Sequence, residues 1–307
     1  MVESEKIASG SVDLILTDPP YGTVTGMADS AKVDHGMKGR TAWDITINPA
    51  DVFEVANRIL RKNGKAVLFA QEPYTSQLIT QAIPNLPFCY RMIWEKDHFA
   101  NSLIAKKAPV SFFEDVLVFS KAHDMESLHP LREYFAQVLE HIGEGLKAVN
   151  ERLGHRRAEH TFYIDSTQYS LCTEATYREL IEAYGIDAME GYKAYAELRE
   201  IDRKYDSTFN LWEGKKYKSN ILTYHKDYGG LHPTQKPVLL LEDLIKTYSN
   251  KGDLVVDLTM GSGSTGVACK NTERRFVGIE MNADYFAIAE QRIREHEPQM
   301  TLWDVGK

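Results

Sequence analysis

Short apolar runs alternate with amphipathic stretches along most of the chain. Residues 11–17 form an apolar, β-branched run that stops at Pro19 and Pro20, as a buried strand stops at a loop. Helical periodicity follows at residues 50–61, and a second apolar run occupies residues 65–70. The same signals predict a helix at residues 74–82 and strands at residues 88–94 and 115–119. This alternation is typical of a doubly wound, mostly parallel α/β sheet.

Helical patterns replace strand patterns between residues 122 and 210. Pro130 stands where the first turn of a helix tolerates proline, and an apolar stripe follows it. The stripe consists of Leu131, Phe135, Val138, Leu139, Ile142 and Leu146, and further helices are predicted at residues 174–184 and 191–205. We therefore interpret residues 122–210 as a helical insertion rather than a linker.

The α/β pattern resumes after the insertion. Helices are predicted at residues 237–249, 265–270 and 283–294, and strands at residues 254–258 and 275–279. These units have the pattern of the opening half of a nucleotide-binding domain, although they lie near the end of the chain. We therefore expect one Rossmann-like domain of permuted chain order, built from residues 1–121 and 211–307 around the insertion.

The composition is that of a soluble globular protein, with 43% hydrophobic and 26% charged side chains in 307 residues. No apolar run reaches the length of about 18 residues that spans a bilayer, and the first residues lack the features of a signal peptide. We expect a cytoplasmic protein with no membrane partner. The three cysteines are widely spaced and the histidines lack ligand spacing, so we predict no disulfide framework and no metal.

The net charge of −8 argues against a nucleic-acid partner until it is resolved along the chain. Residues 122–210 contain 17 acidic and 10 basic side chains, a net charge of −7, which leaves −1 for the remainder. Basic clusters flank the acidic block at Lys106 and Lys107 and at Lys215, Lys216 and Lys218. The acidity is therefore a property of the insertion, and the predicted sheet is nearly neutral.

A glycine loop follows the predicted strand at residues 254–258. Gly261, Gly263 and Gly266 stand between that strand and the next helix, where glycine lets the backbone approach a ligand closely. Glu280 ends the following strand, from which it can accept hydrogen bonds from both hydroxyls of a ribose. The same spacing fits a nicotinamide dinucleotide, but Asp257 would repel its pyrophosphate and would attract a cationic sulfonium.

A second loop with ligand-binding character follows the strand at residues 11–17. The Asp18 carboxylate and the Pro19 carbonyl would be acceptors at the carboxyl end of a parallel strand. The adjacent Pro20 makes the loop rigid, and Tyr21 supplies a flat ring beside the acceptors. Acceptors beside a stacking ring suit an amino group on a planar base.

These residues resemble the amino-group DNA methyltransferases that use S-adenosylmethionine, in the permuted class whose catalytic loop precedes the cofactor loop. Asp-Pro-Pro-Tyr at residues 18–21 is similar to the catalytic motif of that family. The segments at residues 93–96 and 113–121 resemble its base-pocket region, and His-Pro-Thr-Gln-Lys-Pro at residues 232–237 resembles a motif that contacts the cofactor. Phe276 to Glu280 resembles the ribose-binding strand. Helical insertions of this kind are similar to those of phage and prophage members.

The resemblance implies roles for two sets of residues. The catalytic residues would be Asp18, Pro19, Pro20 and Tyr21. The cofactor-binding residues would be Asp257, Thr259, Gly261, Ser262, Gly263, Ser264, Thr265, Glu280, Met281, His232, Thr234 and Lys236. The chain departs from the family at Leu258 and Thr259, where relatives commonly have proline and phenylalanine, so the packing of the cofactor adenosine stays open.

The implied reaction is direct, in-line methyl transfer to the N6 amino group of a flipped-out adenine, with no covalent enzyme intermediate. The chain has no Pro-Cys dipeptide, which a carbon-5 cytosine methyltransferase would need. The aspartate at position 18 resembles adenine-N6 members more than cytosine-N4 members. Cytosine N4 is the alternative target, and a non-catalytic DNA-binding or dinucleotide-binding protein is the alternative from a different class.

Double-stranded DNA is the partner that the resemblance implies. The candidates for phosphate contacts are Lys96, Lys121, Lys215, Lys216 and Lys218. We expect the insertion to recognise the target sequence, with residues 146–160 as a helix, a turn and a reading helix that presents Arg156 and Arg157. A homodimer and a partner restriction endonuclease are left open by the sequence.

Overall fold

The computed structural model describes residues 2–21, 46–100, 105–106, 109–122, 129–166, 168–203, 205–227 and 235–297. The chain divides into two compact units. Unit 1 consists of Met1–Ala122 and Thr208–Lys307, and unit 2 consists of His123–Ser207.

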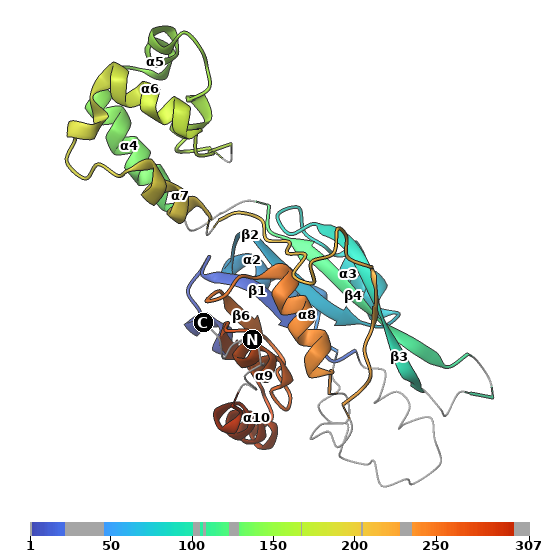
Figure 1. Ribbon diagram of the computed structural model, residues 1–307. Helices are drawn as coiled ribbons and strands as arrows, with labels where there is room; N and C mark the ends of the chain where they lie inside the picture. The colour runs from blue at the N-terminus through green and yellow to red at the C-terminus, as the bar shows by residue number, and fades with distance from the viewer. Residues whose placement is uncertain are drawn as a thin grey trace. The chain divides into compact units, whose positions relative to one another are not determined.

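A seven-stranded sheet forms the centre of unit 1 (Figure 1). Its strands are β1 (Val12–Thr17), β2 (Leu60–Ala70), β3 (Phe88–Ala100), β4 (Ser111–Ser120), β5 (Ile221–Thr223), β6 (Leu254–Asp257) and β7 (Arg275–Gly278). They lie in the order β5-β3-β4-β2-β1-β6-β7. Strand β4 is antiparallel to both of its neighbours, and the other adjacent pairs are parallel. The predicted mostly parallel sheet is confirmed, and β5 is a strand that the sequence did not predict.

Helices cover both faces of this sheet, as the doubly wound prediction requires. The helices of unit 1 are α2 (Pro49–Ile59), α3 (Tyr74–Thr80), α8 (Val238–Tyr248), α9 (Ser264–Asn271) and α10 (Ala283–Glu295), with a 3-10 helix η1 (Val2–Lys6). Successive residues of β1 point to opposite faces: Ile15 packs with α2 and α3, whereas Leu14 and Leu16 pack with α8 and α9. Figure 1 shows α8 lying against the sheet and α10 beyond α9.

The strand order places the loop after β1 and the loop after β6 side by side, at the carboxyl ends of these parallel strands. Strand β1 pairs with β2 on one side and with β6 on the other, with Leu14 opposite Val255 and Ile15 opposite Val256. The chain order reverses between β1 and β6, and crevices at such reversals are where open α/β sheets bind ligands. Because β4 is antiparallel to β2, the first residues of β4 lie beside the carboxyl end of β2, where Asp115 is opposite Ala70.

Unit 2 contains four α-helices and two short 3-10 helices among its described residues. They are α4 (Pro130–Ile142), α5 (Leu146–Leu153), η3 (Glu159–Phe162), α6 (Glu174–Tyr184), η4 (Ile186–Ala188) and α7 (Tyr195–Arg203). The apolar stripe that begins at Leu131 spans two helices, because Gly143 adopts a left-handed conformation with φ of 67° and ends α4. Phe135 and Leu180 are fully buried in the core of this unit.

The predicted reading helix at Arg156 and Arg157 is wrong. Gly154 ends α5 in a left-handed conformation, and the chain then turns into the single turn η3. Thr161 and Phe162 are buried, and the Thr161 hydroxyl donates a hydrogen bond to the Ser170 carbonyl at 3.0 Å. The segment after Gly154 therefore consists of turns and one 3-10 turn, where a reading helix was predicted.

Within the described ranges, no helix is both long and apolar enough to cross a membrane. The same residues contain no group of three or more His, Cys, Asp or Glu side chains that could hold a metal ion.

Candidate active site

Hydrogen bonds join the loop after β1 to the loop after β6. The Thr17 hydroxyl donates to the Asp257 carboxylate at 2.8 Å and lies 2.8 Å from the Thr259 hydroxyl. The Thr259 hydroxyl donates to the carbonyl oxygen of Asp18 at 3.0 Å. The two loops are more than 200 residues apart in the chain, yet they form one hydrogen-bonded structure because β1 and β6 are neighbours.

The Asp257 carboxylate is enclosed by its own loop. It accepts hydrogen bonds from the hydroxyls of Thr17 and Thr265, at 2.8 and 2.6 Å, and from the Thr259 backbone N–H at 3.1 Å. Its residue is only 4% exposed, and this burial raises the pKa of Asp257 to about 6. Direct contact between this carboxylate and a cationic ligand was our expectation, but these bonds make Asp257 and Thr265 part of the architecture of the loop.

Each oxygen of the Asp18 carboxylate accepts a hydrogen bond from a different side chain. The Tyr21 hydroxyl donates to one oxygen, and the Lys236 ammonium donates to the other. The Asp18 side chain remains 24% exposed, so it is still open to solvent. Burial raises the pKa of Asp18, and the positive charge of Lys236 opposes this rise. Burial and the charge of Asp18 together raise the pKa of Tyr21, so its hydroxyl stays protonated.

Glu114 and Lys96 extend this cluster. Lys96 was predicted to contact phosphate, whereas Glu114 was not predicted as a site residue. The Lys236 ammonium lies 3.1 Å from the carboxylate of Glu114, and the Lys96 ammonium lies 2.5 Å from it. Side chains of both lysines are at most 7% exposed. Glu114 could have been noticed because it stands with Asp115 directly before the apolar run of β4. The Lys236 ammonium, which was predicted to contact the cofactor, lies between the carboxylates of Asp18 and Glu114.

Glu280 lies at the end of β7 beside the glycine loop. One of its oxygens accepts a hydrogen bond from the Gly261 backbone N–H at 2.9 Å, and the other accepts from the Asn282 N–H at 2.8 Å. The residue is only partly buried, so its oxygens keep lone pairs that solvent or a ligand can reach. Met281, which follows it, is 83% exposed. A half-buried carboxylate that faces a glycine loop fits the hydroxyl groups of a ribose.

The remaining polar side chains of the glycine loop are held inside the protein. Arg292 of α10 donates to the hydroxyls of Ser262 and Ser264 at 3.3 and 3.0 Å. Gly263 adopts a left-handed conformation with φ of 81° at the start of α9. A Cβ on Gly263 would lie 3.0 Å from the Cβ of Ala289, so this glycine also allows α10 to approach. Arg292 and α10 thus fix the positions of Ser262 and Ser264, and their contacts with a ligand stay a prediction.

Other predicted site residues are less informative. Pro19 is buried and Pro20 is half-buried beside Asp18. His232 and Thr234 lie outside the described residues.

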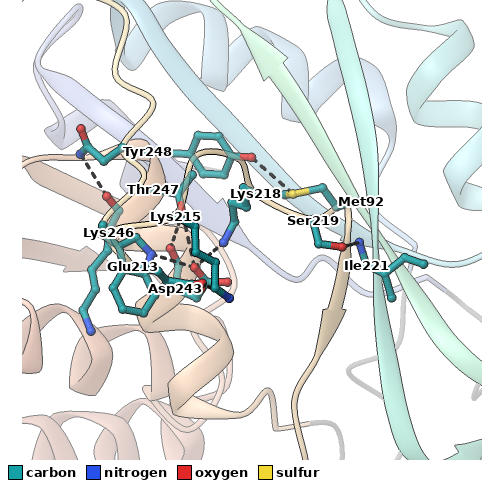
Figure 2. Close-up of polar contacts among 12 residues, drawn as sticks. Met92, Glu213, Lys215, Lys218, Ser219, Ile221, Asp243, Lys246, Thr247 and Tyr248 are labelled. Carbon is teal, nitrogen blue, oxygen red and sulfur yellow. Dashed lines mark hydrogen bonds and ion pairs between the residues drawn. The ribbon is translucent and has the colours of Figure 1, made fainter.

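Two of the lysines predicted to contact phosphate, Lys96 and Lys121, are buried, and the side chain of a third, Lys218, is only 10% exposed, which corrects that prediction. Lys121 is 2% exposed and donates to the carbonyl oxygens of Asn57 and Leu60 at 2.6 and 2.7 Å. Lys96 pairs with Glu114, as described above. The Lys218 ammonium lies 2.5 Å from the buried carboxylate of Asp243, as Figure 2 shows. Charge runs in a sequence do not reveal such distant partners.

The other basic candidates reach solvent. Lys216 is exposed, and the side chain of Lys215 is 68% exposed although it pairs with Glu213 at 2.6 Å (Figure 2). In unit 2, the exposed side chains of Arg156 and Arg157 pair with acidic residues, Glu159 at 2.6 Å and Glu179 at 2.9 Å. Exposed pairs of this kind are weak, so the cations stay available to a stronger anion.

Comparison with known sequences places this geometry in a family. A family model described as DNA methylase, of N6 and N4 methyltransferases, matches residues 12–291. The type II methyltransferase M2.DpnII of Streptococcus pneumoniae is 39% identical over 93 residues, which are 29% of this chain and 35% of the relative. The DNA adenine methyltransferase YhdJ of Escherichia coli (strain K12) is 25% identical over 95% of this chain and 80% of its own length. The matched segments cover 35% and 44% of the lengths of the first two relatives, so the chain spans less than half of each.

Solved structures share the fold. The M1.HpyAVI–SAM complex is similar with a TM-score of 0.51 and 19% identity, over 95% of this chain and 92% of that chain. The cytosine-N4-specific PvuII DNA methyltransferase has a TM-score of 0.50 and 16% identity, over 97% of this chain and 84% of that chain.

Proposed function

Because the chain belongs to the DNA methylase family whose model it matches, we propose that it transfers a methyl group to the N6 amino group of adenine in double-stranded DNA. The methyl donor would be S-adenosylmethionine, since M1.HpyAVI, whose structure shares the fold, forms a complex with SAM. The relative with the widest coverage among those named above is called an adenine methyltransferase, which favours adenine over cytosine.

The observation that carries this proposal is the hydrogen-bonded junction between the Asp18 loop and the glycine loop. Thr259 links the two loops by donating to the backbone carbonyl of Asp18. A target base held at Asp18 would therefore lie at the carboxyl ends of the same two strands as a ligand held by the glycine loop. Transfer between two bound molecules depends chiefly on such fixed proximity.

The Asp18 loop suits an amine that is a poor nucleophile. The lone pair of an exocyclic amine is delocalised into the ring of the base. If its two N–H groups donate to the Asp18 carboxylate and to the Pro19 carbonyl, the nitrogen becomes more tetrahedral and the lone pair is localised on it. Each carboxylate oxygen has about two lone-pair sites. Asp18 can thus accept this bond in addition to those from Tyr21 and Lys236.

The glycine loop fits a nucleoside-containing cofactor. Gly261 and Gly263 both have positive φ, and the Glu280 carboxylate faces the loop from the next strand. In this arrangement Glu280 would accept hydrogen bonds from the ribose hydroxyls. S-Adenosylmethionine supplies an electrophilic methyl group on a sulfonium when it is bound. Asp257 would contribute only a nearby negative charge, because its oxygens are engaged within the loop.

The target base has to leave the duplex to reach the Asp18 loop, at a cost of about a few kcal/mol. Tyr21 is the aromatic ring next to Asp18, and we expect it to stack on the flipped base. We expect unit 2 to contribute to recognition of the DNA sequence, with Arg156 and Arg157 among its exposed basic side chains. Lys215 and Lys216 are the exposed candidates for phosphate contacts in unit 1.

The test is the Asp18→Ala variant. We expect it to lose methyl transfer to DNA while its dissociation constant for S-adenosylmethionine changes by less than about threefold, since the cofactor residues are elsewhere. Tritium transfer from labelled cofactor measures the first quantity, and calorimetry measures the second. Asp13→Asn is the matched control, because Asp13 lies at the opposite end of β1 and pairs with Arg61 at 2.6 Å. Retained turnover in Asp18→Ala would contradict the assignment.

Two controls separate the alternative functions. Digestion of the methylated DNA to nucleosides identifies the modified base, and N4-methylcytosine would replace the adenine proposal with its alternative. A ligand that binds the folded state raises its melting temperature. A rise with NAD and none with S-adenosylmethionine would favour a dinucleotide-binding protein.

A further inference from the structure

We infer that Lys236, held in place by Glu114 and Lys96, is a positioning residue that keeps the Asp18 carboxylate ionised and oriented toward the target amine. This inference rests on the function proposed above. It differs from the expectation that Lys236 contacts the cofactor, which came only from a motif.

The four charged groups alternate in sign and come from separate elements. Asp18 follows β1, Lys236 precedes α8, Glu114 lies in β4 and Lys96 lies in β3. Lys236 contacts both carboxylates, and Lys96 contacts Glu114. Two buried cations therefore balance two carboxylates, which avoids the high cost of an unpaired charge away from water.

The antiparallel direction of β4 makes this cluster. Glu114 is near the start of β4 and opposite Trp94 of β3. It therefore lies at the same end of the strands as Asp18, which follows β1. Lys96 lies two residues beyond Trp94 and therefore on the same face of β3. The Lys96 ammonium is also 5.4 Å from the centre of the Trp94 ring, which restricts its position. Glu114 is thereby fixed, and it in turn directs Lys236 toward Asp18.

Among the described residues, the charges of Lys236 and Glu114 act on Asp18 in opposite directions. Burial raises the pKa of Asp18, Lys236 lowers it and Glu114 raises it. Asp257, at the end of β6, is a further carboxyl group whose charge interacts with that of Asp18. Tyr21 is neutral and donates to Asp18. Lys236 is thus the one cation among these groups that lies directly on the Asp18 carboxylate.

The function of this cation follows from the chemistry of the amine. An ionised carboxylate accepts the amine hydrogen bond, whereas a protonated carboxyl group loses part of its capacity to accept. Without Lys236, Asp18 would take up a proton at a higher pH, and methyl transfer would fail at a higher pH. Without the negative charge of Glu114, Asp18 would stay ionised to a lower pH.

The experiment compares Lys236→Met, Lys236→Arg and Glu114→Gln across a range from pH ~5 to ~9. The measured quantities are kcat, the KM for DNA and the dissociation constant for S-adenosylmethionine. In Lys236→Met we expect the acid limb of the kcat profile to move to higher pH and kcat near neutral pH to fall by about 100-fold, as small misplacements can cause. In Glu114→Gln the acid limb should move to lower pH. Lys236→Arg keeps the charge and should recover kcat to within about tenfold of the wild type.

Two controls separate this positioning from a general loss of structure. Lys121→Met also removes a buried ammonium, at the opposite end of β4, and should lower stability without moving the acid limb. Infrared difference spectra between each protein and its Asp18→Ala derivative follow the titration of the Asp18 carboxyl group without any turnover. The midpoint of that titration should rise in Lys236→Met and fall in Glu114→Gln.

Three outcomes would overturn the inference. The first is an Asp18 titration that Lys236→Met leaves unchanged. The second is a loss of cofactor affinity in Lys236→Met as large as its loss of kcat, which would return Lys236 to the cofactor site. The third is an equal shift of the acid limb in Lys121→Met. If the wild type does not methylate DNA, the proposed function fails, and the infrared titration still decides whether Lys236 controls the charge of Asp18.

Discussion

Thr259 stands where related cofactor loops commonly have phenylalanine, and its hydroxyl makes a bond that an aromatic ring could not make. It donates to the carbonyl oxygen of Asp18 and lies 2.8 Å from the Thr17 hydroxyl. The hydroxyl of Thr259 thus links the two loops directly. Together with the bond from Thr17 to Asp257, this side chain joins the Asp18 loop to the glycine loop.

Replacing Thr259 by valine keeps the shape of the side chain and removes the hydroxyl. We predict a roughly tenfold lower kcat, because one hydrogen bond that aligns the loops is worth about 1 kcal/mol or slightly more. The dissociation constant for S-adenosylmethionine should change little. Thr259→Ser keeps the hydroxyl and serves as the matched control in the same steady-state assay. Equal activity of the valine and serine variants would show that the bond does not align the loops.

Asp257 makes stability depend on pH in an uncommon direction. The folded state raises the pKa of Asp257 to about 6, from a value near 3.8. Between these values the folded state binds more protons than the unfolded state, so the free energy of unfolding falls as the pH rises. The fall should amount to about 3 kcal/mol between pH ~4 and ~6 and then cease.

Urea unfolding of the wild type and of Asp257→Asn over this range measures the effect. Other carboxyl groups titrate in both proteins, so the difference between the two curves isolates Asp257. The asparagine variant is expected to be less stable overall, since an amide accepts fewer of the three hydrogen bonds that Asp257 receives. Parallel curves would contradict the raised pKa.

At the scale of elements, the periodicity of apolar residues was sufficient to predict most helices and strands of the sheet unit. The direction of β4 was not predictable, because a buried strand has the same apolar run whether its neighbours are parallel or antiparallel. That direction brings Glu114 to the active site. The three residues of β5 are too few for a pattern. The break between α4 and α5 depends on Gly143, whose left-handed conformation the apolar stripe does not reveal.

Packing of α9 against α10 depends on a glycine that the motif assigns to ligand binding. A Cβ on Gly266 would overlap the side chain of Ile293 and would come within 2.9 Å of Phe276. We predict that Gly266→Ala lowers the free energy of unfolding by about 1–3 kcal/mol, although alanine favours a helix. Thermal or urea unfolding measures this change.

A double-mutant cycle identifies the cause. Ile293→Ala removes the overlapping atoms, so the double variant with Gly266→Ala should be more stable than the sum of the two single losses implies. Gly145→Ala is the control, because an added Cβ there meets nothing within 4 Å. Strict additivity of the two losses would mean that the overlap with Ile293 is not the cause.

At the scale of the whole molecule, the sequence was sufficient to predict the class of fold and the pairing of an Asp18 loop with a glycine loop. The polar contacts within the site could not be predicted, because partners such as Lys236 and Glu114 are more than 100 residues apart. The same limitation explains the lysines that were assigned to DNA, since burial of Lys121 depends on carbonyl groups about 60 residues away. Charge along the chain predicts where cations occur but not which of them reach solvent.

Among the predicted phosphate contacts, the exposed Lys215 and Lys216 can be separated from the largely covered Lys218 by salt dependence. Each phosphate contact contributes a slope of about 0.9 to the fall of log affinity with log salt concentration. Removing both exposed charges in Lys215→Gln/Lys216→Gln should therefore reduce the slope by about 2 in a fluorescence anisotropy titration with duplex DNA. The Lys215 partner Glu213 is itself partly exposed, so a phosphate can displace it at little cost.

Lys218→Gln is the matched control for that variant, because its ammonium lies on the buried carboxylate of Asp243. Its loss should leave the salt slope unchanged and lower the free energy of unfolding by about 3 kcal/mol, since Asp243 is then buried without its cation. A chain of net charge −8 would in this way bind DNA through a few exposed cations. A slope unchanged in the Lys215/Lys216 variant would move the phosphate contacts to another surface.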